Sequence, residues 1–543
     1  MKKLVSRFMA VLMAMVMILS MSMTVFAAEA PKGILTVNNT VEGKPLDLYQ
    51  IFTATKSGDN VAYTLNSAYE GFFKNNTRIP GSESLTGEAL SEAAYNYVKD
   101  QVGKDGNNGA AFAKDILGWI LENKTTVDAT HTTAHTTAGN TVINNLDYGY
   151  YVVYPLGATD TSAAPGTGQD YTSVASLVSV TDTNVTVNMK SNYPTVVKKV
   201  NEKNADDVNI GDTVTYTLTS KVPDMTGYNS YVFNFKDTLA KGLTFGSITS
   251  VTIDNVTINA DTDGTKAENT YTLTTKNNED GTTEIKIEMN NFLASNANKA
   301  GQTITVTYTA TLNKDAVTGF DPNTNKATVE YSNKPGTDDK GESEPSKVDV
   351  HTFNFTIFKY YKTEGSDTKN PLANAEFELY KANGEVAGDK VNIKKVTEGE
   401  YRVATPEEAA IKGFKSDVIV SGTNGRVLVK GLDAGTYYLR ETKAPDGYNK
   451  LLSDIKVEIK PVYDNSTGKL KSYTVDYTYN GNKTQGTEIT SQDNSPEVAV
   501  ENKTGAQLPS TGSKGALMVT LAGIVLFGAL TASKAFGKKK ANN

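Results

Sequence analysis

The part of the chain with the clearest potential for chemistry is its C-terminal end. Proline stiffens a short polar segment there, and a glycine leaves the peptide bond before it accessible. The segment consists of Leu508, Pro509, Ser510, Thr511 and Gly512. An apolar stretch, residues 516–536, follows and is about long enough to cross the core of a bilayer. Lys538 to Lys540 behind it would stay on the cytoplasmic side.

A generic membrane anchor would need only the apolar stretch and the basic tail. All three parts in this order resemble the LPxTG-type sorting signal of Gram-positive surface proteins. The resemblance implies that a sortase cleaves between Thr511 and Gly512 and passes the Thr511 carbonyl to an amine. We therefore expect residues 504–543 to be a sorting signal that first anchors a precursor in the membrane.

The N-terminus predicts export. Lys2, Lys3 and Arg7 precede an apolar run, residues 8–18, and Val25-Phe26-Ala27 offers small residues at the positions that signal peptidase reads. An N-terminal membrane anchor is the alternative, but the small-residue site favours a secretory signal. We expect residues 1–27 to be a Sec signal peptide, with Ala30 as a second candidate cleavage site.

Composition limits the remaining possibilities. The 543 residues exceed one ordinary hydrophobic core, so two to four domains are expected. The chain has no cysteine, although export would permit disulfides, so any crosslink must use other chemistry. A formal net charge of −7 without a clustered basic stripe argues against nucleic acid as a partner. Alternating β-branched and polar residues between turns predict a mainly β protein of tandem Ig-like sandwiches.

The first expected domain, residues 31–190, is called the N-terminal region below. Strands are expected at residues 34–37, 46–49 and 148–154, with two more in residues 172–187. Apolar residues at helical spacing predict helices at 90–98 and 110–121, so this sandwich should carry helical insertions.

A loop is expected near residues 125–139 of the N-terminal region. His131 and His135 lie in it four residues apart, as a metal-binding pair on a helix would. No third ligand is near, so a solvated loop is favoured over a metal site, and no cofactor is expected. No Ser-His-Asp or Cys-His arrangement can be built either, so we do not expect an enzyme.

Two further all-β domains are expected, the middle region (residues 191–350) and the C-terminal region (residues 351–503). Clean alternation predicts middle strands at 212–218, 231–235, 283–289 and 303–312. The charged and polar stretch 336–346 suggests the boundary between the two regions.

The C-terminal region carries the most specific motif in the chain. Its first strand contains Ile357-Phe358-Lys359, the string Glu441-Thr442-Lys443-Ala444-Pro445-Asp446-Gly447-Tyr448 comes later, and Asn502 follows its last strand. This succession resembles the Cna B-type domain of surface adhesins and pilins. The resemblance implies an intramolecular isopeptide bond between Lys359 and Asn502, promoted by Glu441. Burial supports these residue types, because it makes a lysine a neutral nucleophile and a carboxyl a proton donor.

The middle region carries a comparable set of motifs, which are less specific than that of the C-terminal region. Pro194 to Val200, Phe233 to Leu239 and Asn323 to Tyr331 resemble the isopeptide-forming middle domain of fimbrial shaft subunits. The resemblance gives the roles of nucleophile, acid and amide to Lys198, Asp237 and Asn325. Only one of Lys198 and Lys199 can point into the core, since strand residues alternate faces. Asn323 is the alternative amide, and an ordinary sandwich with surface lysines is the alternative to the bond.

Lys190 lies between the first two regions, in Val187-Asn188-Met189-Lys190-Ser191. Shaft pilins carry a VYPKN-like motif at this junction, whose lysine accepts the Thr carbonyl of the next subunit. Here Asn188-Met189 replaces Tyr-Pro and Ser191 replaces Asn. The resemblance makes Lys190 the candidate acceptor, and a solvated linker lysine is the alternative.

The whole exported chain is similar to a major (backbone) pilin of Gram-positive bacteria. The resemblance implies a covalent cell-surface pilus attached to the cell wall, with sortase and further copies of the chain as partners. Minor pilins and peptidoglycan are possible further partners, and no host ligand can be named. Head-to-tail linkage of Thr511 to Lys190 does not close and so gives a filament. The rivals are a monomeric, peptidoglycan-anchored adhesin (MSCRAMM-like) and, more remotely, an anchored enzyme with its site in the N-terminal region.

Overall fold

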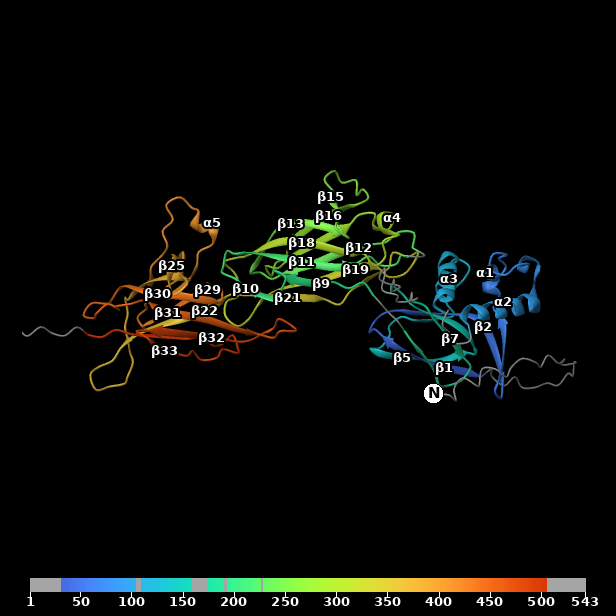
Figure 1. The fold of residues 1–543 in the computed structure, drawn as a ribbon, viewed down its shortest axis with the longest axis horizontal. Helices are drawn as coiled ribbons and strands as arrows, with labels where there is room; N and C mark the ends of the chain where they lie inside the picture. The colour runs from blue at the N-terminus through green and yellow to red at the C-terminus, as the bar shows by residue number, and fades with distance from the viewer. Residues whose placement is uncertain (1–30, 104–108, 159–173, 190–192, 226–227, 505–543) are drawn as a thin grey trace, which may run out of the picture. The chain divides into compact units, whose positions relative to one another are not determined.

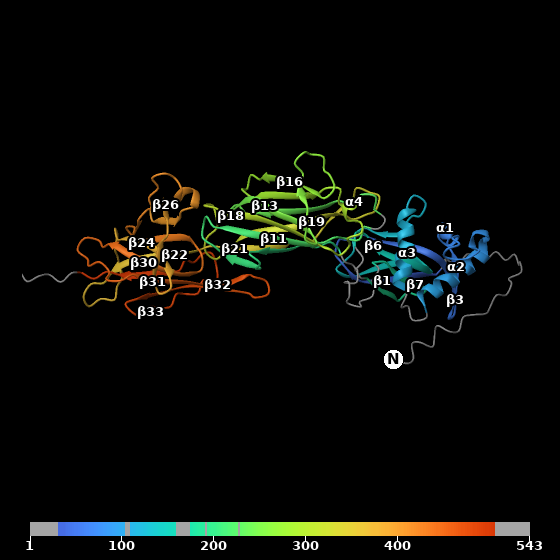
Figure 2. The same cartoon turned by 45° about the horizontal axis from the view of Figure 1, so that its top comes forward.

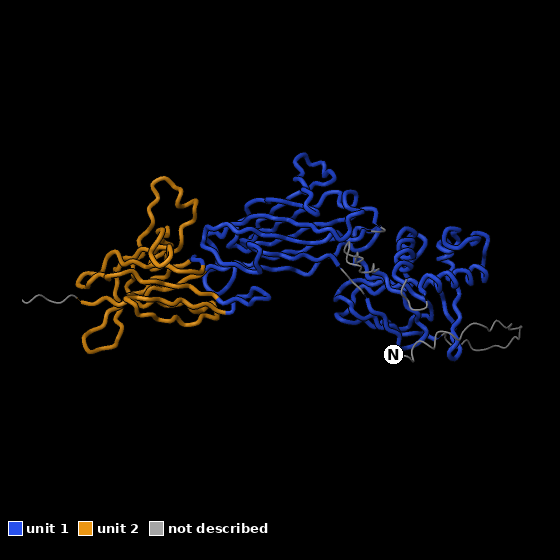
Figure 3. The backbone as a smooth tube through the Cα atoms, in the orientation of Figure 1, with its two compact units in different colours: residues 1–352, 431–433, 462–471 blue, residues 353–430, 434–461, 472–543 orange. Residues whose placement is uncertain are grey.

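The computed structural model of the chain describes residues 31–103, 109–158, 174–189, 193–225 and 228–504 (Figure 1). The expected signal peptide, Lys190 and the sorting pentapeptide with its apolar stretch lie outside these residues. Within the described part, no helix is both long and apolar enough to cross a membrane. The chain divides into two compact units (Figure 3). One contains residues 1–352, 431–433 and 462–471, and the other contains residues 353–430, 434–461 and 472–543.

The N-terminal region is built from two sheets and a helical layer. One sheet has the order β5-β1-β8, and the other has the order β3-β2-β6-β7 with β4 added to β2. The strands are β1 (Lys32–Thr40), β2 (Leu46–Ser57), β3 (Asn60–Leu65), β4 (His131–Thr133), β5 (Gly139–Asp147), β6 (Gly149–Pro155), β7 (Ser176–Val180) and β8 (Val185–Asn188). The helices are η2 (Ser67–Tyr69), α1 (Glu70–Phe73), η3 (Ser82–Ser84), α2 (Gly87–Val102) and α3 (Gly109–Glu122).

The helical layer explains why β2 departs from simple alternation. Seven consecutive residues from Leu46 to Phe52 are buried, because Leu46 and Leu48 face the core between the sheets while Tyr49, Ile51 and Phe52 pack against the helices. Figure 1 shows α1, α2 and α3 in the part of the fold that contains β2, and Figure 2 shows the same three helices in the part that contains β3. The expected helices at 90–98 and 110–121 are confirmed by α2 and α3.

The middle region forms two facing sheets. One has the order β10-β21-β19-β12-β17-β16-β15 with β20 added to β19, and the other has the order β14-β13-β18-β11-β9. The elements are β9 (Val197–Val200), β10 (Ala205–Asp207), β11 (Thr213–Lys221), β12 (Phe233–Leu239), β13 (Leu243–Ile253), β14 (Val256–Thr257), β15 (Asn259–Ala260), β16 (Thr270–Asn277), β17 (Thr283–Met289), α4 (Phe292–Asn296), β18 (Thr303–Leu312), β19 (Asn323–Ser332), β20 (Lys340–Glu342) and β21 (Ser346–His351). Every second residue of β18 is buried, as its sequence alternation predicts.

The C-terminal region also has two sheets. One has the order β23-β22-β29-β27-β26 with β34 added to β22, and the other has the order β25-β24-β30-β31-β32-β33 with β28 added to β24. The elements are β22 (Phe353–Tyr361), β23 (Asn370–Pro371), β24 (Glu376–Asn383), β25 (Val386–Lys390), β26 (Ile393–Thr397), β27 (Glu400–Val403), α5 (Pro406–Ala409), β28 (Ile419–Val420), β29 (Arg426–Leu432), β30 (Gly435–Lys443), β31 (Ile455–Tyr463), β32 (Leu470–Tyr479), β33 (Asn482–Thr484) and β34 (Glu497–Glu501). The first strand, β22, and the last, β34, are parallel neighbours, with Lys359 opposite Val500.

The structure corrects two details. The segment expected as a loop near residues 125–139 contains β4, whose residues His131 to Thr133 pair with β2. Short helices, α4 and α5, interrupt the two regions expected to be all-β, and a Pro406 start with a Thr405–Glu408 capping box explains α5. The mainly β tandem architecture itself is as predicted, and the helical insertion is a minor part of it.

Candidate functional site: two buried lysine, carboxyl and asparagine clusters

The first cluster lies between the two sheets of the middle region and is called the middle cluster. Lys198 enters it from β9, Asp237 from β12, Tyr308 from β18 and Asn325 from β19. Each occupies an inward position of its strand, and none is more than 2 % exposed. Strand alternation usually places apolar side chains at such inward positions. Because polar residues occupy these four positions instead, their side chains meet between the sheets.

The Tyr308 hydroxyl forms a hydrogen bond with each of the other three members of the middle cluster. Lys198 Nζ donates to Asp237 Oδ2 at 2.5 Å and to the Tyr308 hydroxyl at 2.8 Å. The Tyr308 hydroxyl donates to the same Asp237 oxygen at 2.7 Å and accepts from Asn325 Nδ2 at 2.7 Å. One donor and two acceptor positions are all that a phenol offers, so the hydroxyl is fully used.

Burial controls the charge states of the middle cluster. Loss of hydration lowers the pKa of the Lys198 amine, and the nearby Asp237 carboxyl only partly opposes this effect. The amine also lies over the rings of Tyr216 and Tyr308, 4.7 and 5.0 Å from their centroids. Burial raises the pKa of Tyr308 well above its usual value, so its hydroxyl keeps its proton at neutral pH. The site therefore favours a neutral, nucleophilic amine beside a phenol that can donate.

The two alternatives left open by the sequence are placed elsewhere. Lys199 contacts Asn204 Oδ1 with its amine, at 2.5 Å. Asn323 is buried, but its amide is held by the backbone: it accepts from Val317 N at 2.9 Å and donates to the carbonyls of Val317 and Val350. Lys198 and Asn325 are thus the lysine and the amide that the structure brings together around Tyr308.

The second cluster lies in the C-terminal region and is called the C-terminal cluster. Lys359 comes from β22 and Glu441 from β30, and Asn502 follows β34 directly. Their exposed fractions are 0, 2 and 1 %. Lys359 continues the inward series Phe353, Phe355 and Ile357, and Glu441 continues Tyr437 and Leu439, so strand alternation buries both charges.

In the C-terminal cluster the carboxyl contacts the amide directly. Lys359 Nζ lies 3.1 Å from Glu441 Oε1, although the contact is poorly aligned for a hydrogen bond. Glu441 Oε2 accepts from Asn502 Nδ2 at 3.2 Å and from the Leu451 backbone N–H at 2.8 Å. Asn502 Nδ2 also donates to the Asn449 carbonyl at 2.6 Å. Burial lowers the pKa of Lys359 to about 8, against the opposing effect of Glu441.

Both clusters leave the asparagine carbonyl oxygen without a partner. Within the described chain, Asn325 Oδ1 and Asn502 Oδ1 are buried and make no hydrogen bond. Such an unpaired group costs about 1–3 kcal/mol. No hydrogen-bond donor in the described chain therefore holds the carbonyl oxygen of either amide.

Sequence reasoning missed Tyr308 and the backbone groups that hold Glu441 and Asn502. Tyr308 had a visible signal, because it is a hydroxyl-bearing residue at an inward position of a cleanly alternating strand. The supports from Asn449 and Leu451 had none, since they are backbone groups of the irregular segment after β30.

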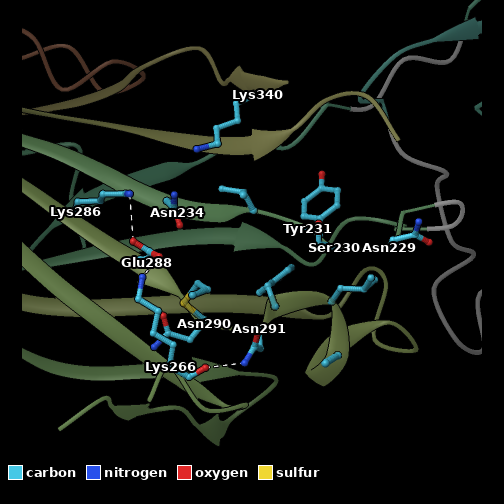
Figure 4. A pocket seen from close by; sticks show the side chains of 15 residues that line it. Asn229, Ser230, Tyr231, Asn234, Lys266, Lys286, Glu288, Asn290, Asn291 and Lys340 are labelled. Carbon is cyan, nitrogen blue, oxygen red and sulfur yellow. Dashed lines mark hydrogen bonds and ion pairs between the residues drawn. The ribbon is translucent and has the colours of Figure 1, made fainter. Parts of the chain in front are cut away.

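Two other features of the described chain lie apart from the clusters. His131 lies in β4, His135 is exposed, and the described residues contain no group of three or more potential metal ligands. A pocket of about 520 Å³ on the middle region is lined by residues of β12, β17 and α4 among others (Figure 4). Its Lys266 and Lys286 both bind Glu288, at 2.7 and 3.2 Å, and it shares no residue with the middle cluster.

The described chain is a protein of tandem two-sheet β domains, two of which bury a lysine, a carboxyl and an asparagine together. Two family models give the particular relationship. The model described as "Gram-positive pilin backbone subunit 2, Cna-B-like domain" matches residues 210–335, and the SpaA "Prealbumin-like fold domain" matches residues 356–476. The chain is thus related to the backbone pilins of Gram-positive bacteria, which are structural proteins of the cell surface.

Individual relatives agree with the family models. The "Trypsin-resistant surface T6 protein" of Streptococcus pyogenes serotype M6 is 27 % identical over 329 residues, which cover 56 % of this chain and 52 % of that protein. The chain thus matches about half the length of this curated relative.

Solved structures of backbone pilins also align. The T6 backbone pilin of serotype M6 S. pyogenes aligns over 88 % of this chain and 100 % of its own, with 17 % identity and a TM-score of 0.45. The pilus 2b backbone protein of group B streptococcus aligns over 58 % of this chain and 99 % of its own, with 27 % identity and a TM-score of 0.39. The major pilin SpaA of Corynebacterium diphtheriae aligns over 87 % and 99 %, with 16 % identity and a TM-score of 0.42.

Proposed function

We propose that this chain is the backbone subunit of a covalent cell-surface pilus, built from three domains, of which the second and third crosslink themselves. The observation that carries the proposal is the pair of buried clusters, each of which brings a lysine, a carboxyl and an asparagine together, through Tyr308 in the middle cluster and directly through the carboxyl in the C-terminal cluster. Asp237, Tyr308 and Asn325 lie within the residues matched by the pilin backbone model, and Lys359 and Glu441 lie within those matched by the SpaA model. Lys198 and Asn502 lie outside the two matches. Natural proteins bury lysine only where it is paired, and here each pair also faces an amide.

The reaction expected at each cluster is amide exchange. The carboxyl removes a proton from the lysine, and the neutral amine attacks the asparagine side-chain carbonyl carbon. A bond forms between the lysine nitrogen and that carbon, the bond from that carbon to Nδ2 breaks, and ammonia leaves with the proton returned to it. In the C-terminal cluster Glu441 meets the amide through Nδ2, which supports proton delivery to the leaving nitrogen rather than polarisation of the carbonyl.

The polymerisation step rests on the sequence, since its residues lie outside the described part of the chain. A sortase would cleave Leu508-Pro509-Ser510-Thr511-Gly512 after Thr511 and join the Thr511 carbonyl to Lys190 of the next copy. The last subunit would be joined to peptidoglycan, and minor pilins could be added by the same chemistry. The chain would do no turnover chemistry of its own and would support adhesion as a shaft.

The test is an immunoblot of cell-wall extracts from cells that carry the chain and its sortase. The proposal predicts a ladder of covalent multimers that resists boiling in detergent. Thr511→Ala and Lys190→Ala should each collapse the ladder to monomer, whereas Lys203→Ala, at an exposed lysine of the middle region, should leave it unchanged. A monomer alone in the unmodified cells would contradict polymerisation and favour the anchored adhesin. A ladder that persists in Lys190→Ala would move the acceptor to another lysine.

A further inference from the structure

The two clusters differ in how the carboxyl reaches the amide nitrogen. In the C-terminal cluster Glu441 Oε2 accepts a hydrogen bond directly from Asn502 Nδ2. In the middle cluster the amide nitrogen of Asn325 donates to the Tyr308 hydroxyl, and that hydroxyl donates to Asp237 Oδ2. A tyrosine hydroxyl therefore stands between the acid and the leaving group in one cluster and is absent from that place in the other.

The side chains explain the difference. Aspartate is one methylene shorter than glutamate, a difference of about 1.5 Å in reach. Asp237 uses one oxygen for both Lys198 and Tyr308, and its other oxygen, Oδ1, has no hydrogen-bond partner in the described chain. Tyr308 extends the reach of this shorter acid to the amide.

We propose that Tyr308 is a catalytic residue of the middle cluster, which relays a proton from Asp237 to the departing Asn325 nitrogen. Asp237 and Tyr308 together would do what Glu441 does alone. The inference rests on the proposed isopeptide chemistry and adds to it a residue that the lysine, acid and amide set does not include.

Every proton in the relay moves between Lys198, Asp237, Tyr308 and Asn325, so the reaction needs no water molecule. Asp237 takes a proton from the Lys198 ammonium, and the neutral amine attacks the Asn325 carbonyl carbon. Tyr308 gives its proton to Nδ2 and regains one from Asp237, the carbon–nitrogen bond breaks, and ammonia leaves. Asp237 then takes the surplus proton from the new amide nitrogen and ends protonated. Because burial keeps the phenol neutral before the reaction, it is ready to donate.

The experiment follows bond formation in the full-length chain, made in cells without sortase. An isotope pulse and chase, followed by proteolysis and mass spectrometry, gives the rate at which the Lys198–Asn325 crosslinked peptide appears. The Lys359–Asn502 peptide from the same molecules serves as an internal reference for synthesis and folding.

The informative variants are Tyr308→Phe, Tyr231→Phe and Asp237→Glu combined with Tyr308→Phe. Tyr308→Phe should slow the middle crosslink by about a hundredfold, a typical effect of general acid catalysis, and leave the reference peptide unchanged. Tyr231→Phe is the matched control, since Tyr231 is also a buried tyrosine of the middle region, lies outside the middle cluster, and has a hydroxyl without a hydrogen-bond partner in the described chain. Asp237→Glu, combined with Tyr308→Phe, should restore part of the rate of the middle crosslink that Tyr308→Phe alone loses.

A second probe separates proton relay from positioning. Position-specific 3-fluorotyrosine at 308 keeps every hydrogen bond but makes the phenol a stronger acid. The relay predicts a faster middle crosslink with an altered pH profile, whereas a purely structural hydroxyl predicts an unchanged rate. This probe also decides the question if Tyr308→Phe fails to fold.

The possible outcomes are distinguishable. A Tyr308→Phe chain that folds and forms the middle crosslink at the unmodified rate would overturn the relay and leave the isopeptide bond intact. Absence of the middle crosslink from the unmodified chain would overturn the proposed bond and the relay with it.

Discussion

The middle and C-terminal clusters use similar residues in different structural settings. In the middle region the lysine and the amide come from different sheets, since β9 and β19 lie in facing layers. In the C-terminal region they come from β22 and the residue after β34, which are parallel neighbours in one sheet. A bond in the first case would tie two layers together, and in the second it would tie the first strand to the last.

This difference determines how each region should carry tension. The Lys359–Asn502 bond would close the C-terminal region at its last strand, because Asn502 directly follows β34. The Lys198–Asn325 bond would leave the rest of β19, then β20 and β21, between the bond and the end of the middle region. The position of the amide in the fold, rather than the presence of a bond, therefore decides how much of a domain the bond protects.

The largest expected effect is mechanical. β19 and β21 are antiparallel, with Asn325 opposite Val348, so a force applied at Asn325 and after His351 would unzip them one pair at a time. Single-molecule pulling of the linked chain should show one extension from the middle region, at most roughly 90 Å long. The C-terminal region should show none.

Lys359→Ala is the control for the pulling experiment, because without its bond the C-terminal region should unravel along its length. If the linked middle region extends by its full length, or does not extend at all, the force does not pass through the Lys198–Asn325 bond as expected.

The acids should be needed equally in both clusters. Glu441→Gln and Asp237→Asn keep the side-chain shape but remove the proton acceptor, so each should leave its own lysine unlinked and the other cluster linked. Closing a loop of this length stabilises a fold by about 4–5 kcal/mol, by the argument used for disulfides. Denaturant unfolding should therefore show a loss of this order in the affected region. Crosslinking that survives in either variant would remove that carboxyl from the chemistry.

The pH dependence should distinguish linked from unlinked chains. In Asn502→Ala the Lys359 amine stays free, with a folded pKa of about 8 against 10.5 when exposed. Between these values the unfolded chain binds more protons, so the free energy of unfolding should rise with pH by about 3 kcal/mol. Below pH 8 the Lys359 amine is charged in both the folded and the unfolded chain, so the cost of burying this charge lowers the free energy of unfolding by its full amount.

The reference for this pH measurement is the double variant Lys359→Met/Asn502→Ala, which lacks the titrating amine. The unmodified chain, whose Lys359 would be an amide nitrogen, should lack the rise as well. A rise of equal size in all three chains would show that other groups cause it.

The smallest expected effect separates the two asparagines of β19. Asn323→Ala should leave the crosslink in place and lower the free energy of unfolding by about 1–3 kcal/mol, because it removes hydrogen bonds to the backbone of Val317 and Val350. Asn325→Ala should abolish the middle crosslink. The crosslinked peptide measures both, and its loss in Asn323→Ala alone would reverse the assignment.

Much of this arrangement was predictable from the sequence, because the motif string is specific. Its resemblance to a Cna B-type domain assigned roles to Lys359, Glu441 and Asn502, whereas a lysine in a strand is by itself normally solvated. The structure places Lys359 at an inward position, in register with Phe353, Phe355 and Ile357. The helices of the N-terminal region followed from their apolar spacing.

What could not be predicted depends on three-dimensional contacts. Asn323 and Asn325 both face inward, and only the backbone bonds of Asn323 show that its amide is already used. Tyr308 is separated from Lys198 by more than a hundred residues and meets it only through the pairing of β18 with β11 and of β11 with β9. The backbone groups that hold Glu441 and Asn502 carry no side-chain signal at all.

The measurement that tests the central claim most directly is the intact mass of the mature chain made without sortase. The mass is compared with that of the sequence counted from the measured N-terminus. Two self-formed crosslinks predict a deficit of two ammonia molecules, reduced to one in Lys198→Ala and to one in Lys359→Ala. A mass equal to that of the plain sequence would contradict both crosslinks and leave a chain with two buried, unlinked lysines.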